Sequence, residues 1–443
     1  MGRGTTFAVF LLASGFLLAG CGKSNQPSAA ASGLVSDAPD PCTIALTAPT
    51  GNDRLDTEIR RLQDHVRQAR DPSAALEQLG WTYIARARVT FDPGYYKLAE
   101  QCALCMESKQ PQSLEAKLLR GHVLHSLHKF KESEAVAREL VAKRGLPFDY
   151  GLLGDVLMEQ GKLADAADAY QHMMDLQPSP QAYSRAAHLR WLKGDLAGAI
   201  EFMQMAAHSS DSRNPEPSAW ANVRLALYEL QAGDANKAGQ FVDMALALQN
   251  DYAPALLVKG RILLAQDRPT EAADALTRAA ALNPLPEYEW VLSEALRAAN
   301  HDGQALAVEA KLKRRGARDD PRTYSLFLST RGEDAGAALQ LAKHELDTRQ
   351  DVFTFDALAW ASLAAGNVAD ARAAMNRALA EGTQDARLFY HAAVIAQAAG
   401  DGAEAARWLA KANALQQMLL PSEREQLAAL QHREPNLVVV RTH

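Results

Sequence analysis

Two cysteines and three histidines stand at spacings that could hold a metal ion. Cys102 and Cys105 are three residues apart, and His122, His125 and His128 follow at intervals of three. Both groups fall in stretches with helical periodicity, so each set can share one face of a helix. Thiolate and imidazole are the ligands of zinc and copper sites, so the pattern is typical of a metal-handling or redox protein.

Other interpretations of the same residues stay open. The two cysteines could be small packed residues, or in an oxidising compartment they could pair with each other, or one of them with Cys42. The histidines could line a binding surface, in which case the two groups would face different directions. We therefore predict no metal site, and we keep a metal or redox site made of Cys102, Cys105, His122 and His125 as the alternative.

Catalytic motifs are missing from the sequence. It contains no G-x-S-x-G, G-x4-G-K-[ST] or G-x-G-x-x-G pattern. His344 and Glu345 begin like H-E-x-x-H, but Thr348 takes the place of the second histidine. The carboxylates mostly stand at helix-surface spacings beside Lys or Arg. We therefore expect a protein that is not an enzyme and needs no cofactor.

A repeated pattern organises most of the chain, and residues 147–180 carry it most clearly. An apolar stripe predicts a first helix, and Gly154 on that helix lets a second helix approach closely. Gly161 interrupts the pattern where the first helix should end, and Pro178 stops the second. The residues that set the spacing are Tyr150, Leu153, Gly154, Leu157, Ala166, Tyr170 and Pro178. So short a helix pair cannot bury its apolar faces alone, which predicts further pairs stacked on it.

Turn residues recur at a nearly constant interval through the remaining chain. They are Gly161, Gly194, Gly233, Asp267, Asn300, Gly332, Gly366 and Gly400. An alanine follows each of them five residues later, at Ala166, Ala199, Ala238, Ala272, Ala305, Ala337, Ala371 and Ala405. The stretch 322–345 departs most from the pattern. Earlier in the chain, residues 76–83 and 118–124 begin two further repeats.

These spacings fit the pattern W-x2-L-G-x2-Y…A-x3-F…P, so residues 73–418 resemble the tetratricopeptide repeat family. The resemblance implies an all-α fold, a right-handed α-solenoid of about ten helix-turn-helix repeats. We expect an additional helix at 52–70 before it and a capping helix at 421–432 after it. Ser422 and Glu425 could form a capping box there. The tail 433–443 has no predicted place.

The resemblance also implies a concave groove that binds a protein or peptide partner. Residues at groove positions are Trp81, His122, His125, Asp155, His188, Trp191, Trp220, Arg261, Trp290, Arg297, Trp360 and Tyr390. Aromatic residues mixed with charges are typical of peptide-binding surfaces. Their spread along the array favours an extended ligand over a small molecule, although some of the tryptophans could pack between helices instead.

The first 20 residues resemble the signal peptide of a bacterial lipoprotein. A short apolar stretch follows Arg3 and ends in Leu18, Ala19, Gly20 and Cys21, which resembles a lipobox. The resemblance implies cleavage before Cys21 and a lipid on that residue, whereas a plain secretory signal is the alternative. We expect residues 21–51 to be a lipidated cysteine and a flexible tether. By analogy, Gly at position 22 favours the outer membrane, facing the periplasm.

Charge argues against one class of partner. The chain has 47 basic and 53 acidic residues and a net charge of -6, with the two signs well mixed along the sequence. A protein whose main partner is nucleic acid usually has a strongly basic surface. We therefore expect the protein to bind a protein or peptide partner and a membrane, and not nucleic acid.

Overall fold

A computed structural model of the chain describes residues 40–208 and 215–432. The described residues belong to one compact unit, and the fold below is the fold of that unit. The predicted signal peptide, the residue Cys21, most of the predicted tether and the predicted tail 433–443 lie outside the described residues.

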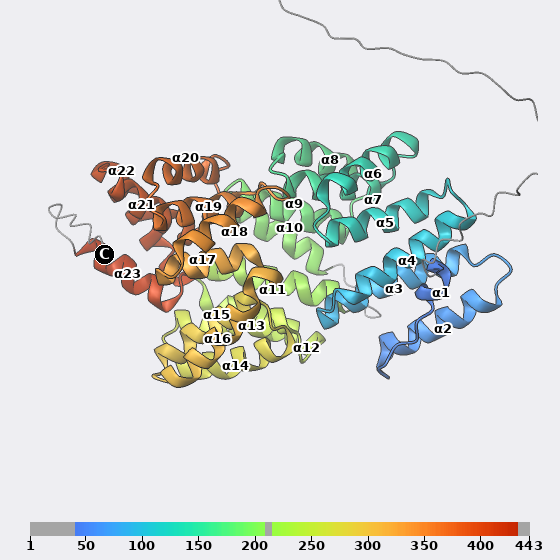
Figure 1. Cartoon of the computed structure of the whole chain (residues 1–443), viewed down its shortest axis with the longest axis horizontal. Helices are drawn as coiled ribbons and strands as arrows, with labels where there is room; N and C mark the ends of the chain where they lie inside the picture. Colours follow the sequence, from blue (N-terminus) through green and yellow to red (C-terminus); the bar gives the residue numbers. More distant parts are fainter. Residues whose placement is uncertain (1–39, 209–214, 433–443) are drawn as a thin grey trace, which may run out of the picture. The chain divides into compact units, whose positions relative to one another are not determined.

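The described residues form an array of α-helices, which confirms the predicted all-α solenoid (Figure 1). Two helices come first, α1 (Pro41–Ala45) and α2 (Arg54–Gln68). Ten helical hairpins follow. The first five are α3 (Ser73–Thr90) with α4 (Gly94–Lys109), α5 (Leu114–Ser126) with α6 (Phe130–Lys143), α7 (Pro147–Glu159) with α8 (Leu163–Leu176), α9 (Pro180–Leu192) with α10 (Leu196–His208), and α11 (Glu216–Gln231) with α12 (Ala235–Leu248). The last five are α13 (Ala253–Ala265) with α14 (Pro269–Leu282), α15 (Pro286–Ala298) with α16 (Asp302–Asp319), α17 (Pro321–Arg331) with α18 (Ala335–Glu345), α19 (Val352–Ala364) with α20 (Val368–Leu379), and α21 (Ala386–Ala398) with α22 (Gly402–Ala414). A 3-10 turn η1 (Gln416–Met418) and the helix α23 (Pro421–Gln431) end the array.

The turns inside the hairpins explain the recurring glycines. All eight predicted turn residues have a positive φ, from 55° at Asp267 to 91° at Gly233. Gly, Asn and Asp adopt this left-handed conformation at the lowest energetic cost. In the first two hairpins the same conformation falls on Phe91 and His128, with φ of 56° and 59°. His128 is therefore a turn residue and not a member of the α5 helix face.

Small residues let the two helices of each hairpin pack closely. Most of the predicted alanines are fully buried, and Ala166 and Ala371 are examples. A Cβ on Gly154 would lie 2.3 Å from the ring of Tyr170, which confirms its role as a point of close approach. In the hairpin of α17 and α18 the fully buried residue is Ala338 and not Ala337. The turn there contains a second residue of positive φ, Asp334, and so is one residue longer.

The later hairpins return to contact the middle of the array, and we call this contact the seam. The Arg349 guanidinium pairs with the Glu159 carboxylate at 2.6 Å, and the Gln350 N–H donates to the Glu159 carbonyl at 3.0 Å. Further along, the Thr383 hydroxyl donates to the Leu192 carbonyl at 2.5 Å. Figure 1 shows the result, with α19 beside α9. The seam joins residues about 190 positions apart in the sequence.

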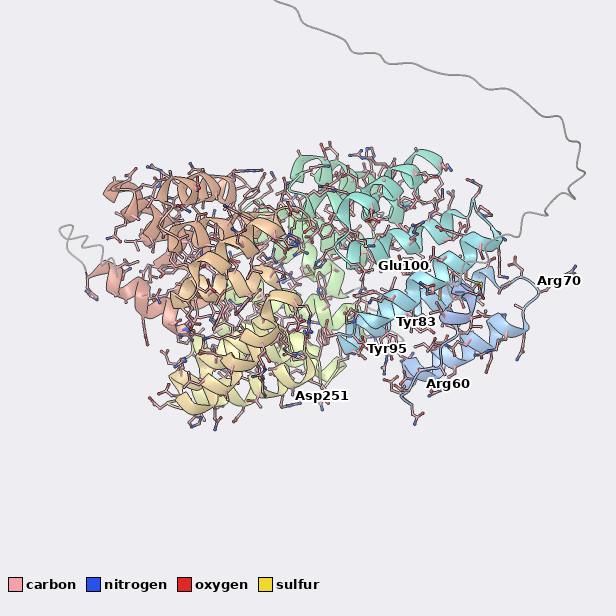
Figure 2. All side chains as sticks on the ribbon, in the orientation of Figure 1. Arg60, Arg70, Tyr83, Tyr95, Glu100 and Asp251 are labelled. Atoms are coloured by element: carbon pink, nitrogen blue, oxygen red, sulfur yellow. A yellow bond between two sulfur atoms is a disulfide. The ribbon has the colours of Figure 1, made fainter. Side chains whose placement is uncertain are left out.

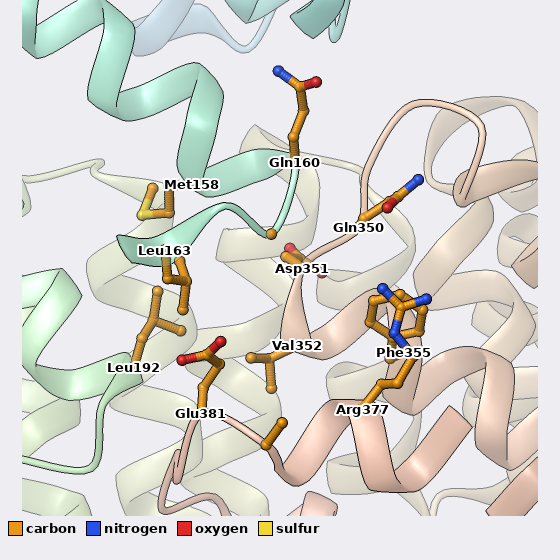
Figure 3. Close-up of a pocket in the computed structure, with 12 residues that line it drawn as sticks. Met158, Gln160, Leu163, Leu192, Gln350, Asp351, Val352, Phe355, Arg377 and Glu381 are labelled. Carbon is orange, nitrogen blue, oxygen red and sulfur yellow. The ribbon is translucent and has the colours of Figure 1, made fainter. Parts of the chain in front are cut away.

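Two turn glycines fit the seam so closely that no side chain could replace their hydrogen. A Cβ on Gly161 would lie 2.3 Å from the carbonyl oxygen of Gln350, and a Cβ on Gly194 would lie 2.5 Å from that of Gly382. Between these contacts the seam leaves a small hollow (Figure 3), to which Met158, Leu192 and Phe355 contribute side chains. These glycines therefore serve both the turn and the seam.

The N-terminal helices pack on the first hairpin. Tyr83 on α3 is fully buried, stacks on Tyr95 of α4 with centroids 6.2 Å apart, and donates to the Ala45 carbonyl at 2.9 Å (Figure 2). Gln63 of α2 donates to the Tyr83 hydroxyl at 2.9 Å. The prediction of a flexible tether up to residue 51 therefore needs a correction, because α1 is an ordered helix held against α3 and α4.

The helix α23 lies where the capping helix was predicted, but its contacts differ. Its first turn is closed by Glu423, which accepts the Leu420 N–H at 2.9 Å, so the proposed Ser422 and Glu425 box is not the one formed. Ser422 instead donates to Glu294 of α15 at 2.9 Å from its hydroxyl and 3.1 Å from its N–H. The helix thus contacts both α22 and α15.

Candidate functional site

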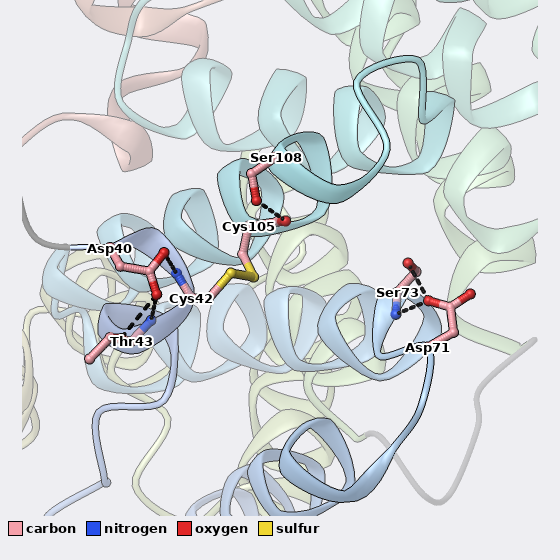
Figure 4. Close-up of a disulfide and its surroundings, with 7 residues drawn as sticks. All are labelled: Asp40, Cys42, Thr43, Asp71, Ser73, Cys105 and Ser108. Carbon is pink, nitrogen blue, oxygen red and sulfur yellow. Dashed lines mark hydrogen bonds between the residues drawn. A yellow bond between two sulfur atoms is a disulfide. The ribbon is translucent and has the colours of Figure 1, made fainter. Parts of the chain in front are cut away.

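The cysteines pair across the N-terminal helices. Cys42 of α1 and Cys105 of α4 form a disulfide with a Cα–Cα distance of 4.8 Å (Figure 4). The pairing is one of the alternatives that the sequence left open. Cys102 is buried without a disulfide, and burial raises the pKa of its thiol.

The residues of the alternative metal site do not converge. His122 packs edge-on against Trp81 with centroids 5.1 Å apart, and His125 packs against Phe130 at 5.5 Å. One cysteine of the set is already oxidised in the disulfide. Among the residues that the structure describes, no group of three or more His, Cys, Asp or Glu side chains could hold a metal ion. The metal alternative therefore gains no support from the geometry.

The first helices of successive hairpins, from α3 to α13, share a surface that we call the inner face. It contains the partly exposed side chains of Trp81, His122, His125, Asp155, His188, Trp191, Trp220, Arg224 and Arg261. Trp220 is the most open of its aromatic residues, with 38% of its surface exposed. Eight of these nine residues stand at predicted groove positions. Their assignment to a partner stays a prediction.

Ion pairs and burial set the charge on this surface. Asp155 accepts two hydrogen bonds from Arg185, at 2.8 and 2.6 Å, and a third from the Tyr170 hydroxyl at 2.9 Å. Burial opposes the charged form of Asp155, but Arg185 outweighs it, and the carboxyl pKa is lowered. Burial also lowers the pKa of His122 and of His188 to about 3. Both imidazoles are therefore neutral at pH 7.

Trp191 connects the inner face to the seam. Its ring stacks on Phe353 of α19 with centroids 5.7 Å apart, and on His188 at 5.6 Å. The indole N–H donates to the Gln231 side chain at 2.8 Å, and Gln231 in turn donates to the Gln384 carbonyl at 2.5 Å. Trp191 is thus a packing residue between distant hairpins as well as a residue of the inner face.

The remaining predicted groove residues contact the chain itself. Trp290, Trp360 and Tyr390 are 1%, 7% and 2% exposed, so a partner cannot reach them in this arrangement. Trp360 stacks on His391 with centroids 4.0 Å apart. Arg297 is held by Glu309 at 3.1 and 2.9 Å. The expected extended ligand along the whole array would have to end near α13.

A cavity lies where the inner face meets α19 and α21, and we call it the inner cavity. Its lining combines apolar, aromatic and oppositely charged side chains. They are Trp191, Arg224, Leu227, Tyr228, Gln231, Arg261, Glu287, Leu326, Phe353, Asp356, Asp385, Arg387 and Met418. Sequence reasoning missed Arg224, Asp356 and Asp385, because only the seam brings α19 and α21 close to α11.

The geometry defines a class of protein, a solenoid of helical hairpins whose first helices line one inner face. A sequence model of the tetratricopeptide repeat matches residues 152–215, which run from within α7 to the residue before α11. Over these residues the chain matches the tetratricopeptide repeat, and the helical hairpins on either side of them continue the same arrangement. No protein with a curated description matches it.

Solved structures with similar folds include three repeat proteins. PilF of Pseudomonas aeruginosa has 14% identity and a TM-score of 0.39, and the match covers 49% of this chain and 96% of that one. YrrB, described as a tetratricopeptide repeat protein with an unusual peptide-binding site, has 12% identity and a TM-score of 0.31, over 45% and 97%. Human IFIT1, solved as a dimer with PPP-AAAA, has 13% identity and a TM-score of 0.45, over 85% and 94%. At these values the likeness concerns the helical fold alone.

Within residues 40–208 and 215–432, none of the helices combines the length and the apolar character needed to cross a membrane.

Proposed function

We propose that the protein is a lipid-anchored scaffold of the bacterial cell envelope that binds a protein or peptide partner on its inner face. In this proposal a lipid on Cys21 holds it in the outer membrane, facing the periplasm, and it catalyses no reaction. The observation that carries the proposal is the inner face itself, where successive repeats present partly exposed aromatic and charged side chains. Because Trp290, Trp360 and Tyr390 are buried, we expect the partner to contact the hairpins from α3 to α13.

The disulfide supports the proposed compartment. Disulfides persist in oxidising compartments such as the bacterial periplasm and are rare in the cytosol. Cys42 stands 21 positions after Cys21, so the covalent link lies close in sequence to the proposed anchor. A lipid-anchored protein exported to the periplasm would form this link after transport.

Site-specific photo-cross-linking in cells tests the partner. A photoreactive amino acid replaces Trp220 on the inner face, and a control variant carries it at Leu306 of α16, which is 57% exposed outside that face. We expect a discrete cross-linked product from position 220 that is missing from position 306. The same products from both positions, or none from position 220, would refute partner binding on the inner face.

Fractionation tests the anchor separately. We expect the wild-type protein in the outer-membrane fraction, labelled by a radioactive fatty acid. A Cys21→Ser variant should lose the label and leave that fraction. A Cys21→Ser variant that keeps the label and stays in the outer-membrane fraction would show that Cys21 carries no lipid. An inner-membrane location of the wild type would contradict only the proposed sorting to the outer membrane.

A further inference from the structure

The inner cavity holds an arginine that lacks an acidic partner. Arg224 of α11 stacks over the rings of Trp191 and Tyr228, at 5.4 and 5.1 Å. One terminal nitrogen contacts the Tyr228 hydroxyl at 3.2 Å and His188 at 3.3 Å. Its Nε is buried without an acceptor, and no carboxylate of the described residues forms an ion pair with it. A planar guanidinium fixed between aromatic rings, with free donors, is suited to bind a carboxylate.

Acidic side chains from other helices line the same cavity. Asp356 of α19 is 2% exposed, and one of its oxygens pairs with His391 at 2.8 Å. Its second oxygen has no hydrogen-bond partner in the described part of the chain. Asp385 caps α21 by accepting the N–H groups of Arg387 and Leu388 through one oxygen, at 2.9 and 3.0 Å. Its second oxygen is likewise without a described partner, so two acceptors remain for a ligand.

The negative charge of Asp356 acts on Asp385. Burial is the main cause of the raised pKa of Asp385. The Leu388 N–H and the charges of Arg387 and Arg261 lower this pKa, and the negative charge of Asp356 raises it. A buried carboxylate without a full set of donors costs free energy that a bound cation would relieve. An ammonium group near the two oxygens would supply both positive charge and three donors.

The charge balance of the cavity selects the ligand further. The lining has three arginines and three acidic residues, so an ion of single sign would meet repulsion from half of them. Leu227, Leu326 and Met418 supply apolar surface between the charged groups. From this arrangement we propose that the inner cavity is a binding site for a zwitterionic small molecule of the amino-acid class. Its carboxylate binds Arg224, and its ammonium group binds Asp356 and Asp385. This site does not depend on the partner proposed for the inner face.

Calorimetric titration of the full-length protein in detergent tests the site, with the twenty free L-amino acids as probes. For each one that binds, the N-acetyl and the C-terminal amide derivatives remove one charge at a time. We expect at least one free amino acid to bind, and both of its derivatives to bind at least tenfold more weakly, because each loses a charge-assisted hydrogen bond. Lack of binding by all twenty at 10 mM, or equal binding of the blocked derivatives, would overturn the proposal.

Variants locate the binding. Asp385→Asn preserves the cap of α21, since Asn caps a helix as well as Asp does, but it removes the charge. Arg224→Gln removes the guanidinium. We expect each to weaken binding roughly 10- to 100-fold. Arg278→Gln on α14, an exposed arginine outside the cavity, should bind like the wild type. If Arg224→Gln does not fold, Asp385→Asn still decides, and wild-type affinity in that variant would overturn the site.

Discussion

Replacing Gly161 by alanine should open the seam, whereas the same change at Gly366 should not. Both glycines occupy the turn position of a hairpin, with φ of 73° and 79°. A Cβ on Gly161 would lie 2.3 Å from the Gln350 carbonyl oxygen, but a Cβ on Gly366 would meet nothing within 4 Å. The two variants therefore share the backbone strain and differ in the seam contact.

The expected magnitudes follow from these contacts. An alanine in the left-handed conformation costs about 1–2 kcal/mol, and this cost applies to both variants. At position 161 the methyl group also has to displace backbone, because ordinary contact distances are about 3.5 Å or more. Overpacking of this kind costs a further ~1–3 kcal/mol. We expect a loss of about 2–5 kcal/mol for Gly161→Ala and about 1–2 kcal/mol for Gly366→Ala.

Amide hydrogen exchange of Gln350 is the most direct assay, since its N–H donates to the Glu159 carbonyl across the seam. In Gly161→Ala this amide should exchange at least tenfold faster than in the wild type, and in Gly366→Ala at the wild-type rate. Urea midpoints of both variants give the accompanying loss of stability. Equal exchange of Gln350 and equal midpoints in the two variants would refute the close approach of Gly161 to α19.

Three further predictions concern stability. Cys42→Ser removes a disulfide that spans 63 positions, so the free energy of unfolding of the N-terminal helices should fall by about 4 kcal/mol. Urea unfolding measures this loss, with Cys102→Ser as the control variant. Equal urea midpoints in the two variants would contradict the prediction. His122 and His188 have folded pKa values of about 3, below the ordinary value of about 6.5. Between these two values the unfolded chain therefore binds more protons than the folded chain. The free energy of unfolding should be highest above pH 6.5 and should decline as the pH falls below it. His188→Gln should show a smaller decline in urea midpoint between pH 7.5 and 5, and an undiminished decline would count against this cause. Trp191→Ala loses the Phe353 stack and the Gln231 hydrogen bond, so the free energy of unfolding should fall by about 3 kcal/mol. Amide hydrogen exchange at the seam should become faster. Faster exchange in α9 alone would show that Trp191 does not support the seam.

The sequence predicted the hairpins well because their determinants are local. Each turn needs one residue of positive φ, and each helix pair needs a small buried residue. Both requirements therefore appear in the sequence as recurring residue types, for example Gly161 and Ala166. The shift from Ala337 to Ala338 escaped prediction because Asp334 gives no spacing signal for a longer turn. The helix α1 was missed because its order depends on Cys105 and Tyr83, far along the chain.

The candidate site was less predictable, for a different physical reason. Groove positions follow from the repeat, but the seam depends on small rotations between hairpins that accumulate over several repeats. The sequence of its own repeat therefore does not determine whether Trp360 contacts a partner or another part of the chain. The unpartnered state of Arg224 likewise depends on the later helices that complete its surroundings. Cys42 had alternative partners, and only the packing of α1 on α4 distinguishes them.

The disulfide has a mechanical consequence for a protein held by a lipid on Cys21, as proposed. Tension on such a leash would enter the folded unit near Asp40 and pass through the sulfur bridge directly into α4. Residues 43–104, which include α2 and α3, lie inside the covalent loop and would bear none of this load. Without the bridge, the same pull would peel α1 and then α2 from the solenoid one after the other. The disulfide would therefore protect the N-terminal helices from mechanical unfolding under tension.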